Sequence, residues 1–158
     1  MSICVLLSEQ ELLMCKLIGA MRSLVARNNH VVDKKMGGQS GAQIDEDGVI
    51  GEFAFCKHFN IFFDLGLSPR SGSYDCLLKD KRIDIKTTRY KTGRLLATTK
   101  INYDVDIYVL AILGDTDVSF VGWIEREQLT TQDNLKDLGR GLGYSLDQDQ
   151  LKSFSKPA

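Results

Sequence analysis

The sequence has few of the residues that build metal clusters or disulfide frameworks. Its 158 residues include four cysteines, scattered without a CxxC pair, and two histidines that lie apart from any cysteine cluster. Scattered cysteines of this kind are typical of free or buried thiols in a reducing compartment. A structural zinc site is therefore not expected. Any bound metal would need oxygen ligands, which suits Mg²⁺ or Mn²⁺.

Long apolar runs and a secretory signal pattern are also missing. No run is long enough to cross a bilayer, and the N-terminus has no basic patch followed by an apolar stretch and a cleavage site. These absences predict an intracellular, cytoplasmic protein without membrane contact. A length of 158 residues fits one compact domain that can hold a core without cross-links.

A strong excess of either charge is lacking too, since the net charge is −1, which argues against a protein that coats nucleic acid through bulk charge. Basic residues are nevertheless concentrated locally. Positions 70–100 hold nine basic and three acidic residues, whereas from position 101 onward acids outnumber bases ten to five. A locally basic surface around a few carboxylates is what cutting a polyanion requires. A solvated hairpin with ordinary lysines would give the same count, and on charge alone that interpretation is favoured.

Two helices are predicted near the N-terminus. Ser8 and Glu11 have the spacing of a capping box, and the apolar residues that follow predict a helix over 8–29. Its apolar face is wider than one packing contact needs, so we expect it to pack on the domain and also on a second copy in a homodimer. Polar, glycine-rich residues 33–43 predict a loop, and residues 45–59 predict a second helix.

The remaining chain predicts mainly strands, over 61–65, 74–78, 82–88, 106–113 and 118–124. The run 106–113 is apolar almost throughout, as expected of a central strand covered on both faces. Gly122 predicts a bulge or a close approach. The connection before position 106 leaves room for a further helix, and a short helix is predicted over 125–129. The expected fold is therefore α/β, a central mixed sheet flanked by helices, with an extra N-terminal helix.

We expect a single domain over 1–158. It divides into an N-terminal helix and loop over 1–44, a core over 45–124 and a C-terminal extension over 125–158.

The segment RIDIKTT, residues 82–88, places charged side chains on one face of a strand. Because side chains alternate, Asp84, Lys86 and Thr88 point away from the two flanking isoleucines. If the preceding hairpin closes through Lys79 and Asp80, Asp75 faces Asp84. A register two residues wider sets Asp75 opposite Lys86 instead. Both registers leave Asp75, Asp84 and Lys86 on one face.

Two carboxylates opposite one another repel, and a divalent cation between them would remove that cost. The main-chain carbonyl of Ile85 lies at the same edge and offers a further oxygen. Glu52, within the second predicted helix, supplies a fourth group. The neighbouring Gly48 and Gly51 weaken that helix, which makes sense if it must pack close to the sheet and aim Glu52 at the metal.

This constellation predicts phosphodiester chemistry. A hard cation held by Asp75, Asp84 and Glu52 would polarise a scissile phosphate. Lys86 would position or deprotonate the attacking water, or stabilise developing negative charge; the sequence leaves the base undecided. The nearby basic residues Arg89, Lys91 and Arg94, together with Thr88, are candidates for contacts to DNA phosphates.

These residues resemble the PD-(D/E)XK nuclease superfamily, the restriction-endonuclease-like fold, over about Gly48 to Trp123. In that family a helix glutamate precedes a β-hairpin that bears an aspartate and then Asp/Glu-x-Lys. The matching positions here are Glu52, Asp75, Asp84 and Lys86, with Tyr74 where the family often has proline. The resemblance implies a Mg²⁺-dependent deoxyribonuclease.

A narrower similarity concerns residues 69–78, PRSGSYDCLL. They are similar to the Arg-Ser-Gly-Ser segment, followed by aspartate, of archaeal Holliday-junction resolvases. That resemblance implies that Arg70, Ser71 and Ser73 contact phosphate. Small phage or mobile-element nucleases of the same superfamily are equally similar.

The leading hypothesis is therefore a DNA endonuclease. A Holliday-junction resolvase or exonuclease of the same fold remains an alternative, as does a catalytically silent DNA-binding or protein-interaction module. Titration with a divalent metal ion distinguishes the nucleases from the catalytically silent modules, because only a nuclease requires a metal site with oxygen ligands.

Overall fold

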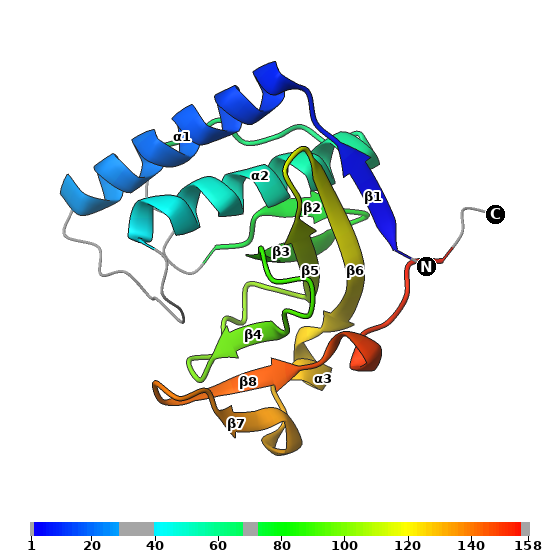
Figure 1. Cartoon of the computed structure of the whole chain (residues 1–158). Helices are drawn as coiled ribbons and strands as arrows, with labels where there is room; N and C mark the ends of the chain where they lie inside the picture. The colour runs from blue at the N-terminus through cyan, green and yellow to red at the C-terminus, as the bar shows by residue number, and fades with distance from the viewer. Residues whose placement is uncertain (1, 29–39, 68–72, 156–158) are drawn as a thin grey trace.

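The computed structural model describes residues 2–28, 40–67 and 73–155 as two β-sheets and two long helices (Figure 1). In chain order the elements are β1 Ile3–Leu6, α1 Glu9–Asn28, α2 Gly41–Phe59, β2 Cys76–Leu78, β3 Lys81–Thr88, β4 Leu95–Thr98, β5 Ile107–Leu113, β6 Asp117–Glu125, α3 Arg126–Leu129, β7 Leu135–Asp137 and β8 Leu142–Leu146. Two short 3₁₀ turns lie at Gln132–Asn134 and Gln148–Gln150.

The central sheet is mixed and has the strand order β1-β6-β5-β3-β2. Its β3 and β5 are parallel, whereas its other neighbouring strands are antiparallel. Alternate residues of β5 are buried in two separate cores: Val109 and Ala111 on the helix side, Tyr108 and Leu110 on the opposite side. The prediction of a central strand covered on both faces is confirmed.

The two long helices cover one face of this sheet, whereas the expectation was of helices on both sides; on the other face only the short α3 is helical among the described residues. Helix α2 packs on the central strands and α1 lies across α2 (Figure 1). The opposite face is covered by a three-stranded sheet of order β4-β8-β7 and by α3. The connection before β5 contributes β4 instead of a helix, because Leu95 and Ala97 alternate into the core with the period of a strand.

The N-terminal predictions hold with shifted boundaries. Ser8 and Glu11 form the expected capping box: the Ser8 N–H donates to the Glu11 carboxylate at 2.9 Å, and the Glu11 N–H to the Ser8 hydroxyl at 3.1 Å. Helix α2 begins at Gly41, four residues before the predicted start, because Ser40 caps it by accepting from the Gln43 N–H at 3.2 Å. Residues 33–39 of the predicted loop lie outside the described residues.

Several strands differ from the sequence-based prediction. Residues 61–65 form no strand, while the short strands β1, β4, β7 and β8 have no counterpart in it. Strand β8 pairs with β4, so residues 142–146 of the C-terminal extension complete a sheet with the core. Gly122 is a site of close approach, as predicted: a Cβ there would lie 2.6 Å from the Leu151 Cβ, next to a register shift in the β5–β6 pairing.

One side of α1 carries an exposed apolar stripe. Its buried residues Cys15, Gly19 and Ser23 face the rest of the chain, and a Cβ on Gly19 would lie 2.5 Å from the Glu46 Cα of α2. The opposite side exposes Leu13, Leu17, Met21 and Leu24, each by roughly half of its surface. Among the described helices, none is long and apolar enough to span a membrane.

Candidate functional site

A tight hairpin between β2 and β3 sets the register of the candidate site. Leu78 pairs with Lys81, as predicted for a turn closed through Lys79 and Asp80. Both turn residues adopt positive φ angles, 49° and 64°, as in the two-residue turns that match the twist of the flanking strands.

Asp84 and Lys86 share one face of β3, as alternation predicts. The Lys86 Nζ lies 2.8 Å from the Asp84 Oδ1, and the two side chains are 37% and 14% exposed. Ile83 and Ile85 are buried on the helix side of the sheet. The Lys86 ammonium also lies over the Tyr108 ring, 5.6 Å from its centroid, which places the ion pair between β3 and β5.

Asp75 lies directly before β2 and is tied to β3 by two hydrogen bonds. Its N–H donates to the Ile83 carbonyl at 2.8 Å, and its Oδ2 accepts from the Ile85 N–H at 2.7 Å. Burial and the negative charges of Glu52 and Asp84 raise the pKa of Asp75 well above its usual value; the Ile85 N–H and Lys86 oppose the shift only in part. Two of the carboxylates predicted from the sequence, Glu52 and Asp84, therefore act electrostatically on the third, Asp75.

Lys86 remains a cation in this environment. Burial lowers its pKa, but attraction to Asp84, the hydrogen bond to that carboxylate and attraction to Asp75 together outweigh burial and raise the pKa above its usual value. A protonated lysine can stabilise negative charge, whereas a general base must first lose its proton.

Glu52 acts on Asp75 through its charge, and the helix α2 that carries it approaches β3 closely. A Cβ on Gly51 would lie 2.5 Å from the Thr87 Oγ1 and 3.5 Å from the Ile85 Cγ2, so glycine is required at this contact. Gly48 has no neighbour within 4 Å of its Cβ position, and its predicted packing role is wrong. It lines a cleft instead.

Arg22 of α1 holds Glu52 in place, a role that sequence reasoning missed. Its Nη1 lies 3.1 Å from the Glu52 Oε2, and both side chains are 15% exposed. The same guanidinium donates to the Asp64 and Gly66 carbonyls and lies 5.5 Å from the Phe63 ring centroid. In the sequence, only the presence of a basic residue in a helix with many apolar residues indicated this role. The partners of Arg22 lie 30 to 44 positions away along the chain, so the sequence does not identify them.

The donor chemistry of the site fits a hard divalent cation, but the side chains do not converge on one position. Oxygen atoms of Asp75, Asp84 and Glu52, with the Ile85 carbonyl, are the ligand type that Mg²⁺ and Mn²⁺ prefer. In residues 2–28, 40–67 and 73–155, however, no group of three or more His, Cys, Asp or Glu side chains is arranged to hold a metal ion. Asp84 pairs with Lys86, Glu52 pairs with Arg22 and Asp75 accepts from Ile85. Cation binding would exchange some of these partners.

A cleft of about 850 Å³ opens beside the Asp84–Lys86 pair. Strand β3 and the start of α2 line one side of it. Strand β4 and the β4–β5 connection line the other side. Two tyrosines on this lining, Tyr90 and Tyr103, are among the most exposed aromatic side chains of the described residues.

The predicted DNA contacts are distributed unevenly around this cleft. Ser73, Thr88 and Arg94 line it. The Thr88 Oγ1 accepts from the Tyr90 N–H at 3.2 Å, and Arg94 forms an ion pair with Asp147 at 2.7 Å. Arg70 and Ser71 lie outside the described residues.

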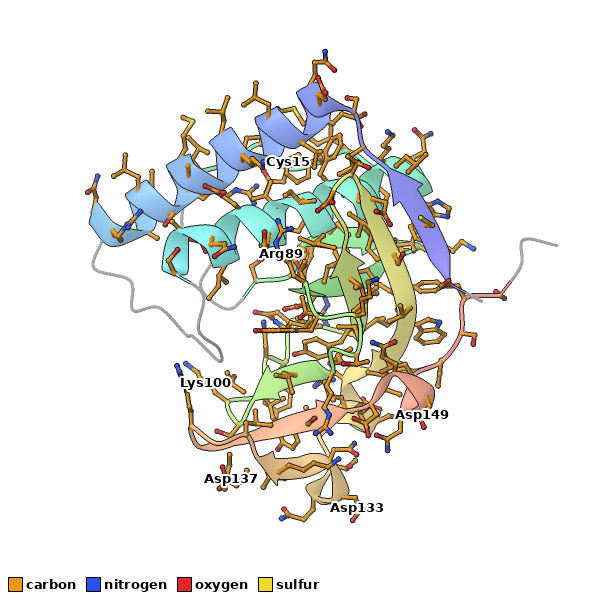
Figure 2. The ribbon with its side chains drawn as sticks, in the orientation of Figure 1. Cys15, Arg89, Lys100, Asp133, Asp137 and Asp149 are labelled. Atoms are coloured by element: carbon orange, nitrogen blue, oxygen red, sulfur yellow. The ribbon has the colours of Figure 1, made fainter. Side chains whose placement is uncertain are left out.

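Arg89 and Lys91 do not line the cleft. Arg89 forms a two-pronged ion pair with the buried Asp47 of α2, with an Nη2–Oδ1 distance of 2.8 Å, and Figure 2 shows it next to α2. This pairing leaves its 41% exposed side chain little freedom to move to a phosphate. Lys91 borders a shallow surface depression with Arg94 and Asp147.

A family model matches residues 2–120 of this chain and describes a family of unknown function, DUF5843. Neither a curated protein nor a solved structure matches the chain.

Proposed function

The chain belongs to the DUF5843 family of unknown function, and we propose from its own site that it is a metal-dependent deoxyribonuclease of the PD-(D/E)XK type. The proposal rests on one observation above all. The charges of the helix glutamate Glu52 and the strand aspartate Asp84 both act on the buried Asp75, and the protonated Lys86 lies beside Asp84 in a cleft.

The order of these groups along the fold supports the proposal. Glu52 lies on the helix that packs against β3, Asp75 comes before the first hairpin strand, and Asp84 and Lys86 lie on the second. The PD-(D/E)XK family presents its glutamate, aspartate and Asp/Glu-x-Lys in the same order. A restriction-endonuclease-like fold is therefore part of the proposal.

Each residue has a distinct role in the proposed reaction. Asp75, Asp84, Glu52 and the Ile85 carbonyl would hold Mg²⁺ or Mn²⁺, which when bound supplies Lewis-acid polarisation of the scissile phosphate. Lys86 stabilises negative charge on the phosphate oxygens, because its raised pKa keeps it protonated. Arg22 fixes the orientation of Glu52, and Ser73 and Thr88 lie on the cleft wall where they can donate to a phosphate.

A homodimer formed through α1 belongs to the same proposal. One site of this kind cuts one strand, so a small enzyme that cuts two strands, in a duplex or at a junction, needs two sites. The exposed stripe of Leu13, Leu17, Met21 and Leu24 is self-complementary when two copies of the helix pack across a two-fold axis.

The experiment is a cleavage assay on supercoiled, linear, single-stranded and four-way-junction DNA, with and without Mg²⁺ or Mn²⁺. The proposal expects cleavage that needs a divalent cation and that Asp84→Ala abolishes, and the preferred DNA separates endonuclease, exonuclease and resolvase. An absence of cleavage on all four DNAs, with DNA binding retained, would support the catalytically silent alternative.

A further inference from the structure

We infer that the cleft beside Asp84 and Lys86 takes unpaired DNA nucleotides, whose bases stack on Tyr90 and Tyr103. This inference rests on the proposed function, since it names the substrate class of the same site. It makes single-stranded or locally unpaired DNA the substrate, in preference to an uninterrupted duplex.

The first observation is the exposure of the two rings. Tyr90 is 74% and Tyr103 is 69% exposed, and both line the cleft that contains the Asp84–Lys86 pair. Large aromatic side chains are usually buried in part because their apolar faces are costly to expose to water. Two exposed rings in one cleft therefore present a surface for a flat, aromatic ligand.

The second observation is that hydrogen bonds hold the two turns that carry the rings. The Tyr90 N–H donates to the Thr88 Oγ1 at 3.2 Å, and its carbonyl accepts from the Gly93 N–H at 2.9 Å, which fixes the turn after β3. Tyr103 lies in a second turn, in which Asn102 accepts from the Asp104 and Val105 N–H groups. Fixed platforms lose little conformational entropy when a base stacks on them.

The third observation is that Tyr103 already has a cationic partner. The Arg126 guanidinium lies 5.0 Å from the Tyr103 ring centroid, and the Arg126 side chain is only 16% exposed. The contact holds the ring, while 69% of the residue stays exposed for a ligand. Arg126 is also paired with the exposed Glu127 at 3.6 Å, so its role beside the cleft is to support the ring.

The positive charges on the cleft lining complete the argument. Lys86, Arg94 and Lys100 lie on it, and Lys100 lies across from α2, next to the second sheet (Figure 2). Lys86 is ion-paired with Asp84 and Arg94 with the half-exposed Asp147, so a DNA phosphate would take the place of Asp147 at Arg94. Single-stranded DNA is bound by this combination of cationic side chains along the backbone and aromatic rings under the bases. In a continuous duplex the base faces are stacked on one another, so the rings could reach only sugars and phosphates.

The size of the cleft agrees with this substrate. A volume of about 850 Å³ lies within the range of about 300–1,000 Å³ that encloses small ligands, and so accommodates a short run of nucleotides.

The test measures binding by fluorescence anisotropy with the full chain in EDTA, so that no cleavage is needed. The probes are a labelled single-stranded DNA, the same strand annealed to its complement, and single-stranded RNA of that sequence. The variants are Tyr103→Leu and Tyr90→Leu, which remove the aromatic ring, with Tyr103→Phe and Tyr90→Phe as matched controls. Because both tyrosines are largely exposed, all four variants are expected to fold, which circular dichroism checks.

We expect wild type to bind single-stranded DNA at least tenfold more tightly than the duplex. Each leucine variant should lose about tenfold in affinity for the single strand, within the range measured for one base–aromatic stack, while each phenylalanine variant keeps it. Equal affinity of the leucine and phenylalanine variants, or tighter binding of the duplex, would overturn the inference. Tighter binding of the RNA would overturn the assignment to DNA.

These outcomes are separable from the nuclease proposal. Metal-dependent cleavage with unchanged binding by the leucine variants leaves the nuclease standing and refutes the stacking role. Ring-dependent binding of the single strand without cleavage in Mg²⁺ or Mn²⁺ supports the cleft assignment and removes the catalytic one.

Discussion

The contact between α2 and β3 at Gly51 allows a sharp test of how the candidate site is built. A Cβ at position 51 would lie 2.5 Å from the Thr87 Oγ1, too close for any real Cβ, so Gly51→Ala must move α2 or Thr87. Gly48, one turn earlier on the same helix, has no neighbour within 4 Å of its Cβ position. Gly48→Ala is therefore a matched control that changes helix propensity without the contact.

The expected magnitudes follow from these two environments. Alanine is favoured over glycine within a helix by about 1 kcal/mol, so Gly48→Ala should stabilise the protein by up to this amount. Gly51→Ala gains the same propensity but adds an overpacking cost of about 1–3 kcal/mol. The propensity terms cancel in the comparison, so Gly51→Ala should be less stable than Gly48→Ala by about 1–3 kcal/mol.

Urea denaturation followed by far-ultraviolet circular dichroism measures the difference, provided that the m-value stays constant. The Thr87→Ala change should restore most of the loss in the Gly51→Ala background. It removes the Thr87 Oγ1, the atom that lies 2.5 Å from the Cβ position, and this oxygen is buried without a hydrogen-bond partner among the described residues. Equal stability of the two glycine variants would refute the close approach.

Three further predictions concern α1 and the thiols. Arg22→Ala should destabilise the protein by about 1–3 kcal/mol and lower DNA cleavage, because it removes the ion pair with Glu52 and the hydrogen bonds to two main-chain carbonyls; normal cleavage by this variant would remove its positioning role. The double variant Leu17→Glu, Met21→Glu should sediment as a monomer and wild type as a dimer, whereas a monomeric wild type at micromolar concentration, with DNA and metal present, would exclude assembly through α1. Of the four cysteines only Cys4 is exposed, and burial raises the pKa of Cys15 to about 12, so a thiol reagent should modify one group per native chain and four after unfolding; fast native reaction of a second thiol would contradict the packing.

The local geometry of the site followed from the sequence because two simple rules determine it. Side-chain alternation placed Asp84 and Lys86 on one face of a strand, and a two-residue turn set the hairpin register. The continuous apolar run of β5 identified the central strand for a similar reason, since only a strand covered on both faces needs apolar residues at every position.

The second sheet escaped prediction because its strands are short and lie far apart in sequence. Strand β4 pairs with β8, so Leu95 lies opposite Leu146 across about 50 positions of chain. A run of four residues is too short for its alternation of buried and exposed positions to predict a strand. Whether it forms a strand depends on the tertiary pairing with another segment. The ion pairs of Arg22 with Glu52 and of Asp47 with Arg89 could not be predicted for the same reason. They depend on how α1 and α2 pack against each other and against the sheet.

A count of basic residues does not show which of them are paired within the chain, for the same reason. A count of basic residues over 70–100 treats all of them as available to DNA, yet Arg89 is paired with Asp47, Arg94 with Asp147 and Arg82 with Asp106. Intramolecular partners of this kind cannot be identified from a single sequence. The cleft lining, with Lys86, Lys100 and the two exposed tyrosines, is the more specific indication of a nucleic-acid ligand.

The DNA cleavage rate of Lys86→Ala in Mg²⁺ or Mn²⁺, beside wild type, tests the central claim most directly. The variant removes the ammonium that lies 2.8 Å from Asp84 and leaves all the carboxylates that would hold the cation. The account predicts that divalent-cation binding, measured by calorimetry, persists while cleavage falls by about 100-fold or more, the usual loss when one preorganised charge stabiliser is removed. Cleavage by purified Lys86→Ala at the wild-type rate would contradict it.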